Sequence, residues 1–290
     1  MTSRKVKIVR SPLRYPGGKS KALEQIERFL PAAFSEYREP FVGGGSLFIR
    51  LRQLMPHARV WINDLNPDLY CFWKCAQSDL KSLTAEVARV KTVARDGRKL
   101  FQDLTANYDA ELSGMERAVR FFVLNRITFS GTVDAGGYSQ KAFESRFTES
   151  SIKRLGELRD VLEGVRITNL DYREVLRAPG DGCFVFLDPP YLSAAKSKLY
   201  GRRGRLHSSF NHDEFAESLK AYSHKWLVTY DDSPEIRNNF PFANIYEWEL
   251  QYGMNNFRRD FAPKGKELFI TNYEVNARET QQEVELASGS

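Results

Sequence analysis

The sequence predicts an α/β fold with a mainly parallel central sheet, and one short stretch carries the clearest signs of it. The run Cys183–Leu187 is apolar throughout, as in a strand that is buried on both faces. Asp188, Pro189 and Pro190 follow at once, and consecutive prolines end a strand because they cannot donate to a sheet ladder. Segments with helical spacing separate this run from others like it, as expected for a parallel sheet with helices on both faces.

The expected strands are short apolar or alternating runs bounded by turn residues. In chain order they span 37–42, 60–63, 165–170, 183–187 and 225–230, with 244–251 and 267–273 as a terminal antiparallel pair. Apolar residues at helical spacing predict helices after the turn at 17–20 and over 46–55, 67–110, 116–128, 150–162 and 211–222. Asn211 is the expected N-cap of the last helix.

The composition favours a globular protein with a sizeable core. The 290 residues are 42% hydrophobic, and no apolar run approaches the roughly 18 residues of a transmembrane helix. Three cysteines and no recognisable leader lead us to expect a cytoplasmic protein. Cys71 and Cys75 have no histidine at ligand spacing, so we expect structural thiols and no metal site. A net charge of +6 modestly favours a polyanionic partner.

A glycine-rich turn opens the first helix. The run R-Y-P-G-G-K-S over residues 14–20 offers free backbone N–H groups to an anion. It is not the phosphate-binding loop of nucleoside triphosphatases, because that motif needs a glycine five positions before Gly18 and Leu13 stands there. We expect a tight turn that places Tyr15 and Lys19 on one side.

A second glycine run follows the first expected strand. Gly43, Gly44 and Gly45 would let a ligand approach the backbone closely, and strand, glycine turn and helix together are typical of a nucleotide-binding unit. Asp64 ends the next strand about 20 residues later, where an acid can accept both hydroxyls of a ribose. Asp64 could instead cap the helix that follows it. Its strand position and spacing favour the ribose interpretation.

The chain between the second and third strands is long, mainly helical and partly basic. Within it, residues 129–147 show no helical period, and an irregular stretch of this length is usually functional. The predicted core therefore comprises residues 11–69 and 164–275, with 70–163 as a helical insertion and with 1–10 and 276–290 as flexible tails. A lid that only covers a cofactor is the alternative for the insertion. A basic tract over 196–205 follows Tyr191, where we expect phosphate contacts rather than only a solvated charge run.

Four motifs now stand in one order between Arg14 and Tyr191: R-Y-P-G-G-K, E-P-F-V-G-G-G, N-D-L-N and D-P-P-Y. Together they resemble the DNA adenine methylase family (D12 class, alpha motif order), over most of residues 11–275. The resemblance implies a Rossmann-like methyltransferase sheet and an inserted, mainly helical DNA-recognition domain. It also implies S-adenosylmethionine as cofactor and site-specific methylation of the N6 amine of adenine in double-stranded DNA. A prokaryotic or phage origin and a cognate restriction endonuclease are further expectations.

Carried to this chain, the family motifs imply three sets of residues. The cofactor would contact Tyr15, Lys19, Phe41, Gly43, Asp64 and Asp188. The catalytic residues around the adenine would be Asp188, Pro189, Pro190 and Tyr191. DNA would contact Arg126, Lys141, Arg146, Lys196, Lys198, Arg202, Arg203 and Arg205. Arg126 and Gly131 match an R-x-x-x-x-G pattern of the family, but the following G-G-Y-S-Q-K-A-F differs from the loop of enzymes that methylate GATC, so that specificity is not assumed.

The D-P-P-Y residues suit methylation of an amine. The lone pair of the adenine amine is delocalised into the ring, and hydrogen bonds from both N–H groups to the Asp188 carboxylate and the Pro189 carbonyl would free it. Tyr191 would stack on the base, which is worth about 1–3 kcal/mol. The base must first leave the helix, at a cost on the order of a few kcal/mol, which phosphate contacts by basic residues would offset.

Several alternatives stay open at this point. The fold could serve an N4-cytosine or a protein glutamine methyltransferase, although an aspartate in place of serine or asparagine at 188 argues against each. A non-catalytic DNA-binding subunit of a modification system could keep the fold, but intact Lys19, Asp64 and D-P-P-Y argue against that. D-P-P could also be an ordinary proline turn that packs Tyr191 on the core.

Overall fold

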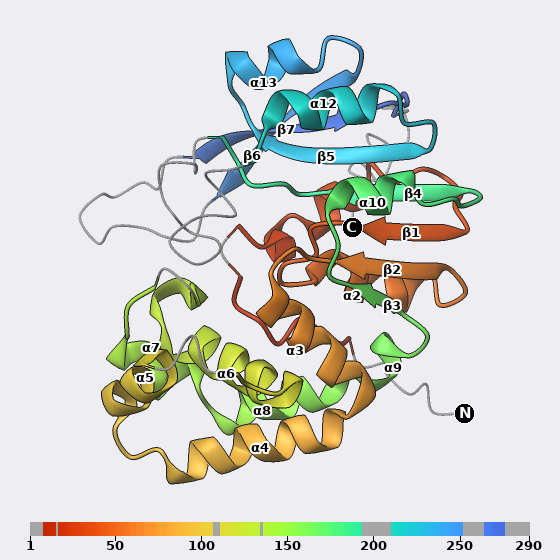
Figure 1. The fold of residues 1–290 in the computed structure, drawn as a ribbon. Helices are drawn as coiled ribbons and strands as arrows, with labels where there is room; N and C mark the ends of the chain where they lie inside the picture. Colours follow the sequence, from red (N-terminus) through yellow and green to blue (C-terminus); the bar gives the residue numbers. More distant parts are fainter. Residues whose placement is uncertain are drawn as a thin grey trace, which may run out of the picture.

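A single sheet organises the structure, a computed structural model that describes residues 8–15, 17–106, 111–133, 136–192, 210–251 and 264–275. Its seven strands lie in the order β3-β2-β1-β4-β5-β7-β6 (Figure 1). Parallel pairing joins the first five: β1 (Glu36–Glu39), β2 (Arg59–Asn63), β3 (Arg166–Thr168), β4 (Cys183–Leu187) and β5 (Lys225–Asp231). The antiparallel strands β6 (Asn244–Gln251) and β7 (Lys264–Thr271) complete it, with β7 inserted beside β5. The predicted α/β fold with a Rossmann-like sheet is confirmed.

The strand order reverses between β1 and β4. The chain moves outward from β1 to β2 and β3, and then returns to place β4 on the other side of β1. In open α/β sheets the crevice at such a switch point, beyond the carboxyl ends of the strands, is where ligands bind.

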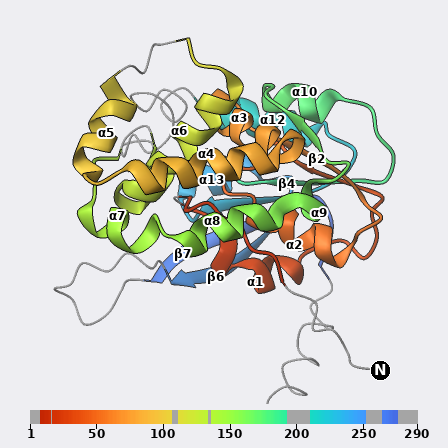
Figure 2. The same ribbon diagram turned by 90° about the horizontal axis from the view of Figure 1, so that it is seen from below.

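Helices cover both faces of the sheet. The first face carries α1 (Leu23–Glu27), α2 (Ser46–Leu54), α3 (Pro67–Ser78) and α9 (Arg159–Leu162), whose apolar residues join one core cluster. The second face carries α10 (Tyr172–Arg177), α12 (His212–Lys220) and α13 (Pro234–Asn239) over a separate cluster. Figure 2 shows α10 and α12 on one side of the strands and α1, α2 and α9 on the other. Asn211 caps α12 as predicted, since its side chain accepts from two backbone N–H groups. None of the helices described here is both long and apolar enough to cross a bilayer.

A helical body lies beside the sheet (Figure 1). It contains α4 (Leu80–Val93), α5 (Gly97–Ala106), α6 (Gly114–Ile127), α7 (Gln140–Arg146) and α8 (Glu149–Leu155), with short 3₁₀ turns at Phe129–Gly131 and Gly156–Leu158. The prediction of an irregular stretch over 129–147 is wrong in its second half, where α7 lies. That helix has fewer than two full turns, too few to show a period, and it begins with a Ser139 cap that accepts from the Ala142 N–H.

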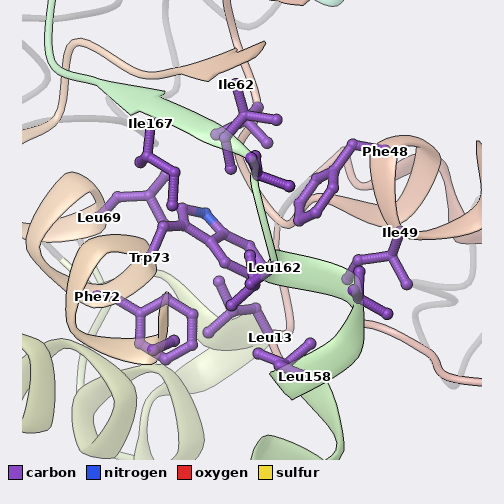
Figure 3. Packing of buried hydrophobic residues seen from close by; sticks show 14 of the residues in the cluster. Leu13, Phe48, Ile49, Ile62, Leu69, Phe72, Trp73, Leu158, Leu162 and Ile167 are labelled. Atoms are coloured by element: carbon purple, nitrogen blue, oxygen red, sulfur yellow. The ribbon is translucent and has the colours of Figure 1, made fainter. Parts of the chain in front are cut away.

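Trp73 on α3 joins the helical body to the sheet. Its side chain is fully buried and lies among Phe48, Ile62 and Ile167 (Figure 3). The neighbouring Phe72 stacks on Phe122 of α6, with ring centroids 5.9 Å apart. The same apolar cluster therefore runs from the sheet into the helical body.

A buried arginine ties β1 to the chain that leads into β4. Arg38 is 0% exposed, and it donates to the carbonyls of Val175, Ala178 and Pro179 at 2.7–2.8 Å. Its Nε also donates to Glu36 at 2.6 Å. These bonds fix the end of α10 next to the strand that carries D-P-P-Y.

Replacing Arg38 with methionine should leave these carbonyls unsatisfied and Glu36 partly buried without its main partner. We expect the free energy of unfolding to fall by about 3–5 kcal/mol. Arg59→Met is the matched control, because Arg59 contacts the same Glu36 from a side chain that is 66% exposed, and it should cost at most about 1 kcal/mol. Urea titration of both variants measures the difference; equal losses would contradict the role given to Arg38.

Candidate active site

Three neighbouring strands end at the switch point. Gly43 follows β1, Asp64 follows β2 and Asp188 follows β4. Adjacent strands lie about 4.8 Å apart, so the ends of β2 and β4 are separated by on the order of 10 Å. One small molecule can span that distance. The residues predicted from different motifs are therefore brought to one edge of the sheet.

The glycine turn after β1 packs directly against Tyr15. Gly43 has a φ of 45°, and a Cβ placed there would lie 2.8 Å from Cε1 of the Tyr15 ring. At Gly44 a Cβ would lie 2.8 Å from the Tyr15 Cβ. The positive φ of Gly43 and the close approach of Tyr15 both exclude side chains from this turn. The Tyr15 side chain occupies the space that they would need.

Asp64 is held by backbone N–H groups. Gly43 donates to one carboxylate oxygen and Asn66 to the other, each at 3.0 Å. Burial raises the pKa of Asp64 to about 6, although these two hydrogen bonds act in the opposite direction. The cap of α3 is Asn66, which accepts from the N–H groups of Asp68 and Leu69. The alternative in which Asp64 caps the helix is wrong.

Lys19 and Asp188 form a buried ion pair. The Lys19 Nζ lies 2.7 Å from the Asp188 Oδ1, and the lysine side chain is only 5% exposed. The same ammonium donates to the Gly17 carbonyl at 3.0 Å. Thr229 of β5 donates to the same Asp188 oxygen at 2.6 Å. The turn at 17–20 and the tip of β4 are thus joined through one carboxylate.

Tyr191 lies beside this ion pair. The Lys19 Nζ is 4.8 Å from the centroid of the Tyr191 ring, and the Tyr191 hydroxyl donates to Glu267 of β7 at 3.0 Å. The centroid of the Tyr230 ring on β5 lies 6.0 Å from the centroid of the Tyr191 ring. Tyr191 is half-buried rather than enclosed in the core. Asp188, Pro189 and Pro190 follow β4 as the sequence predicts, with Pro189 buried.

Two further carboxyls reach the site and were missed from the sequence. Glu39 is buried on β1 and accepts from the Tyr37 hydroxyl at 2.7 Å; burial, with smaller effects of Asp188 and Asp64, raises its pKa to about 8. Burial likewise raises the pKa of Glu267 to about 7, with Lys19 acting against it and Asp188 adding to it. The position of Glu267 next to the apolar run Leu268–Ile270 is the signal that could have identified it, whereas Glu39 stands in the E-P-F-V-G-G-G motif.

The N-terminal segment is pinned to the helical body. The Asn125 amide of α6 donates to the Arg14 carbonyl at 2.7 Å and its oxygen accepts from the Arg14 N–H at 2.9 Å. Gly131 lies in close contact with the same segment. A Cβ at this position would lie only 2.1 Å from the Arg14 carbonyl oxygen. Arg126 donates to the carbonyl of Pro12. Any displacement of α6 therefore moves the turn that carries Tyr15 and Lys19.

The predicted DNA-binding residues fall into three groups. Arg126 is 4% exposed, and burial together with nearby Arg14, Arg154 and Arg146 lowers its pKa to about 9, so its side chain supports the N-terminal segment. Lys141 and Arg146 of α7 are exposed. Lys196, Lys198, Arg202, Arg203 and Arg205 lie outside the described residues.

Two aromatic residues complete the surroundings. Phe41, predicted to lie under the cofactor, packs in an aromatic cluster with Tyr172 and Phe210, at centroid distances of 5.5 and 5.8 Å. Phe129 at the end of α6 is 66% exposed and precedes Ser130, whose φ of 54° is unusual for a serine.

Gly131→Ala should displace the Arg14 carbonyl and weaken binding of S-adenosylmethionine, because the new methyl has no room and the φ of 76° disfavours it. We expect a loss of affinity of about tenfold, equivalent to about 1.4 kcal/mol. Gly137→Ala is the control, since a Cβ there meets nothing within 4 Å. Isothermal titration calorimetry compares the two; equal affinities would show that the contact with Arg14 does not position the turn.

The raised carboxyl pKa values predict a stability that falls as pH rises. The folded state holds protons on Asp64, Glu267 and Glu39 more tightly than the unfolded chain, so their contribution is present below the unfolded pKa and is lost through about pH 6 to 8. Glu39→Gln removes the largest of these pKa shifts. For each pKa unit removed, the total decrease in the free energy of unfolding with rising pH should become smaller by about 1.4 kcal/mol. Denaturant titrations of the ligand-free protein at a series of pH values measure this, with exposed Glu163→Gln as control. If the stability of Glu39→Gln decreased with pH as steeply as that of the wild type, the burial of an ionisable carboxyl at this position would be contradicted.

Comparison with known proteins shows the family to which this chain belongs. The chain is 28% identical over 231 residues to the type II methyltransferase M.MjaIII of Methanocaldococcus jannaschii, covering 72% of this chain and 78% of that protein. It is 24% identical over 281 residues to M1.LlaDCHI of Lactococcus lactis, covering 90% and 94%. It is also 25% identical over 196 residues to the DNA adenine methylase of Vibrio cholerae, covering 64% and 66%. The family model of the D12 class N6 adenine-specific DNA methyltransferases matches residues 15–254, which include every described residue of the switch-point site except Glu267, and the chain belongs to that family.

Proposed function

We propose that this DNA adenine methyltransferase takes the methyl group from S-adenosylmethionine and transfers it to the N6 amine of an adenine that has left double-stranded DNA. The observation that supports this proposal most strongly is the ion pair between Lys19 and Asp188, whose charged atoms lie 2.7 Å apart. This ion pair joins the N-terminal turn to the D-P-P-Y tip next to Tyr191. A cofactor-binding segment and a base-binding segment thus share one carboxylate. The family favours adenine over the cytosine alternative.

The residues at the switch point fit the cofactor chemically. Asp64 accepts one backbone N–H on each oxygen, so lone pairs remain for the two hydroxyls of a ribose. Asp188 and Lys19 offer opposite charges for the amino and carboxylate groups of the methionine part. The Tyr15 ring over Gly43 forms an apolar wall beside them. Contact of Phe41 with the cofactor stays a prediction.

The charge of the site also suits a cationic ligand. Glu39, Asp64 and Glu267 all have pKa values above their ordinary range, and Asp188 contributes to two of these shifts. A positive charge among such groups lowers the cost of their ionisation. When bound, S-adenosylmethionine supplies an electrophilic methyl group on a positively charged sulfur.

In the proposed reaction the chain's own groups activate the amine. The Asp188 carboxylate and the Pro189 carbonyl accept hydrogen bonds from its two N–H groups, which frees the nitrogen lone pair for attack on the methyl carbon. The nitrogen then loses a proton, for which Asp188 is the acceptor. Tyr191 stacks on the base, worth about 1–3 kcal/mol. Alignment of amine and methyl could supply about 7–11 kcal/mol of the barrier.

The helical segment 70–163 is proposed to recognise the DNA sequence, apart from the core segments 11–69 and 164–275. Exposed Lys141 and Arg146 on α7 can contact phosphates there. Arg126 has a supporting role instead, because its buried guanidinium donates to the Pro12 carbonyl. The tract over 196–205 keeps its predicted role in phosphate contacts.

Two cellular expectations accompany the activity. Methylation of genomic DNA would take place in the cytoplasm of a prokaryotic cell. Relatives are called type II methyltransferases, and a cognate restriction endonuclease would make this chain the protective half of such a pair. Other relatives are called DNA adenine methylases, and the alternative that we propose is an enzyme without a cognate endonuclease.

Replacing Asp188 tests the proposed reaction. The wild-type protein, given S-adenosylmethionine and unmethylated genomic DNA, should produce N6-methyladenine, detected by mass spectrometry and located by modified-base sequencing. Asp188→Ala and the closer isostere Asp188→Asn should lower the rate by at least about 10³-fold, because both alignment and hydrogen bonding are lost, while DNA binding persists. Asp160→Ala, an exposed carboxylate on α9, should behave as wild type. Turnover by folded Asp188→Asn at the wild-type rate, or methylation of another base, would end the proposal.

A further inference from the structure

Glu267 occupies a position where a carboxyl is costly. It lies on β7 with 1% of its surface exposed, next to the fully buried Leu268 and Phe269. It pairs across the sheet with Asp231 of β5 on one side and Trp248 of β6 on the other. A carboxyl in an apolar sheet persists at such a place when it is hydrogen-bonded and electrostatically compensated.

The bond that Glu267 makes reaches the proposed catalytic tip. Its Oε2 accepts from the Tyr191 hydroxyl at 3.0 Å, across strands that are far apart in the sequence. At the ring of Tyr191 lies the Lys19 ammonium, 4.8 Å from the centroid. Tyr191 is thus held at its hydroxyl by Glu267 and at its ring by Lys19.

The same contacts extend to Asp188. Lys19 pairs with the Asp188 carboxylate, and Thr229 donates to the same oxygen at 2.6 Å. Glu267, Tyr191, Lys19 and Asp188 therefore form one connected set in which the orientation of each side chain depends on the next.

We propose that Glu267 is a positioning residue for the methyl transfer: from β7 it fixes the Tyr191 ring, and through Lys19 it maintains the geometry of Asp188. This inference rests on the proposed function, since it assigns to Glu267 an effect on the base-binding tip. Glu267 itself touches neither the base nor the cofactor in this proposal. Its effect should appear in the rate of transfer rather than in cofactor affinity.

Ionisation of Glu267 makes the positioning depend on pH. The charged groups that face it are Lys19 from the N-terminal turn, Asp188 after β4 and Asp231 from β5, and the titratable but neutral Tyr191 hydroxyl hydrogen-bonds to it. Burial raises its pKa to about 7, Lys19 lowers it, and Asp188 and Asp231 raise it. A carboxylate accepts from the Tyr191 hydroxyl more strongly than a neutral carboxyl does. Methyl transfer should therefore weaken as pH falls through about 7.

Three variants test this connection, with the wild-type enzyme assayed first. Glu267→Gln keeps an acceptor for Tyr191 but cannot ionise, Tyr191→Phe removes the donor, and the double variant removes both. Glu247→Gln on the adjacent β6, with a side chain that is 63% exposed, is the matched control. Single-turnover transfer of a radiolabelled methyl group to genomic DNA gives the rate, calorimetry gives the affinity for S-adenosylmethionine, and thermal melting confirms folding.

Each single variant should slow transfer by up to about 100-fold, the size expected when a group near the reaction is misplaced. Cofactor affinity should stay within about threefold, a change of less than about 1 kcal/mol. The double variant should be no slower than Tyr191→Phe alone, because Glu267→Gln only weakens the bond that Tyr191→Phe already removes. The acidic fall in kcat/KM near pH 7, which reports the free enzyme, should be absent in Glu267→Gln and present in Glu247→Gln.

The inference would be overturned if the rate losses of the two single variants multiplied in the double variant. It would also be overturned if kcat/KM of Glu267→Gln fell at acidic pH as it does in the wild-type enzyme. If Glu267→Gln fails to fold, Tyr191→Phe alone tests the inference. A wild-type rate of transfer in folded Tyr191→Phe overturns the inference. A slower rate with unaltered cofactor affinity supports it. Failure of the wild-type enzyme to methylate adenine would instead count against the proposed function. The two failures are thereby distinguishable.

Discussion

The ion pair between Lys19 and Asp188 is the contact on which the rest of the site depends. It joins two segments that lie far apart in the sequence, the N-terminal turn and the tip of β4. Removing one partner of a buried pair typically costs about 3–5 kcal/mol, because the other charge is left without compensation. Tyr191, Thr229 and the Gly17 carbonyl are all arranged around this pair. The position of the proposed base-binding tip is thus tied to the position of the cofactor turn.

The sheet explains why this arrangement is possible. Reversal of strand order between β1 and β4 leaves a crevice at their carboxyl ends, and the motifs after β1, β2 and β4 all open into it. The helical body reaches the same crevice through Asn125, which holds both the N–H and the carbonyl of Arg14. The helical body is therefore joined to the N-terminal segment by a pair of hydrogen bonds.

Local signals made part of this fold predictable. The bounds of β4 follow from an apolar run and the two prolines that stop it, and the Asn211 cap follows the usual preference for asparagine. Tyr15, Lys19, Asp64 and Asp188 were predicted from the motifs, and the structure places them at one edge. Long-range pairing was not predictable. The contact of Glu267 with Tyr191 depends on β7 being inserted beside β5, which no local pattern specifies. Burial of Arg126 depends likewise on how α6 packs against residues 11–15, whereas its basic side chain alone indicated a surface role.

A structure with bound sinefungin, a stable analogue of S-adenosylmethionine, tests the central claim most directly. The account predicts one molecule whose ribose hydroxyls lie within hydrogen-bond distance of Asp64 while its amino acid part reaches the Lys19 and Asp188 pair. An analogue that contacts only one of these two carboxylates, or binds away from the crevice between β1 and β4, would contradict it.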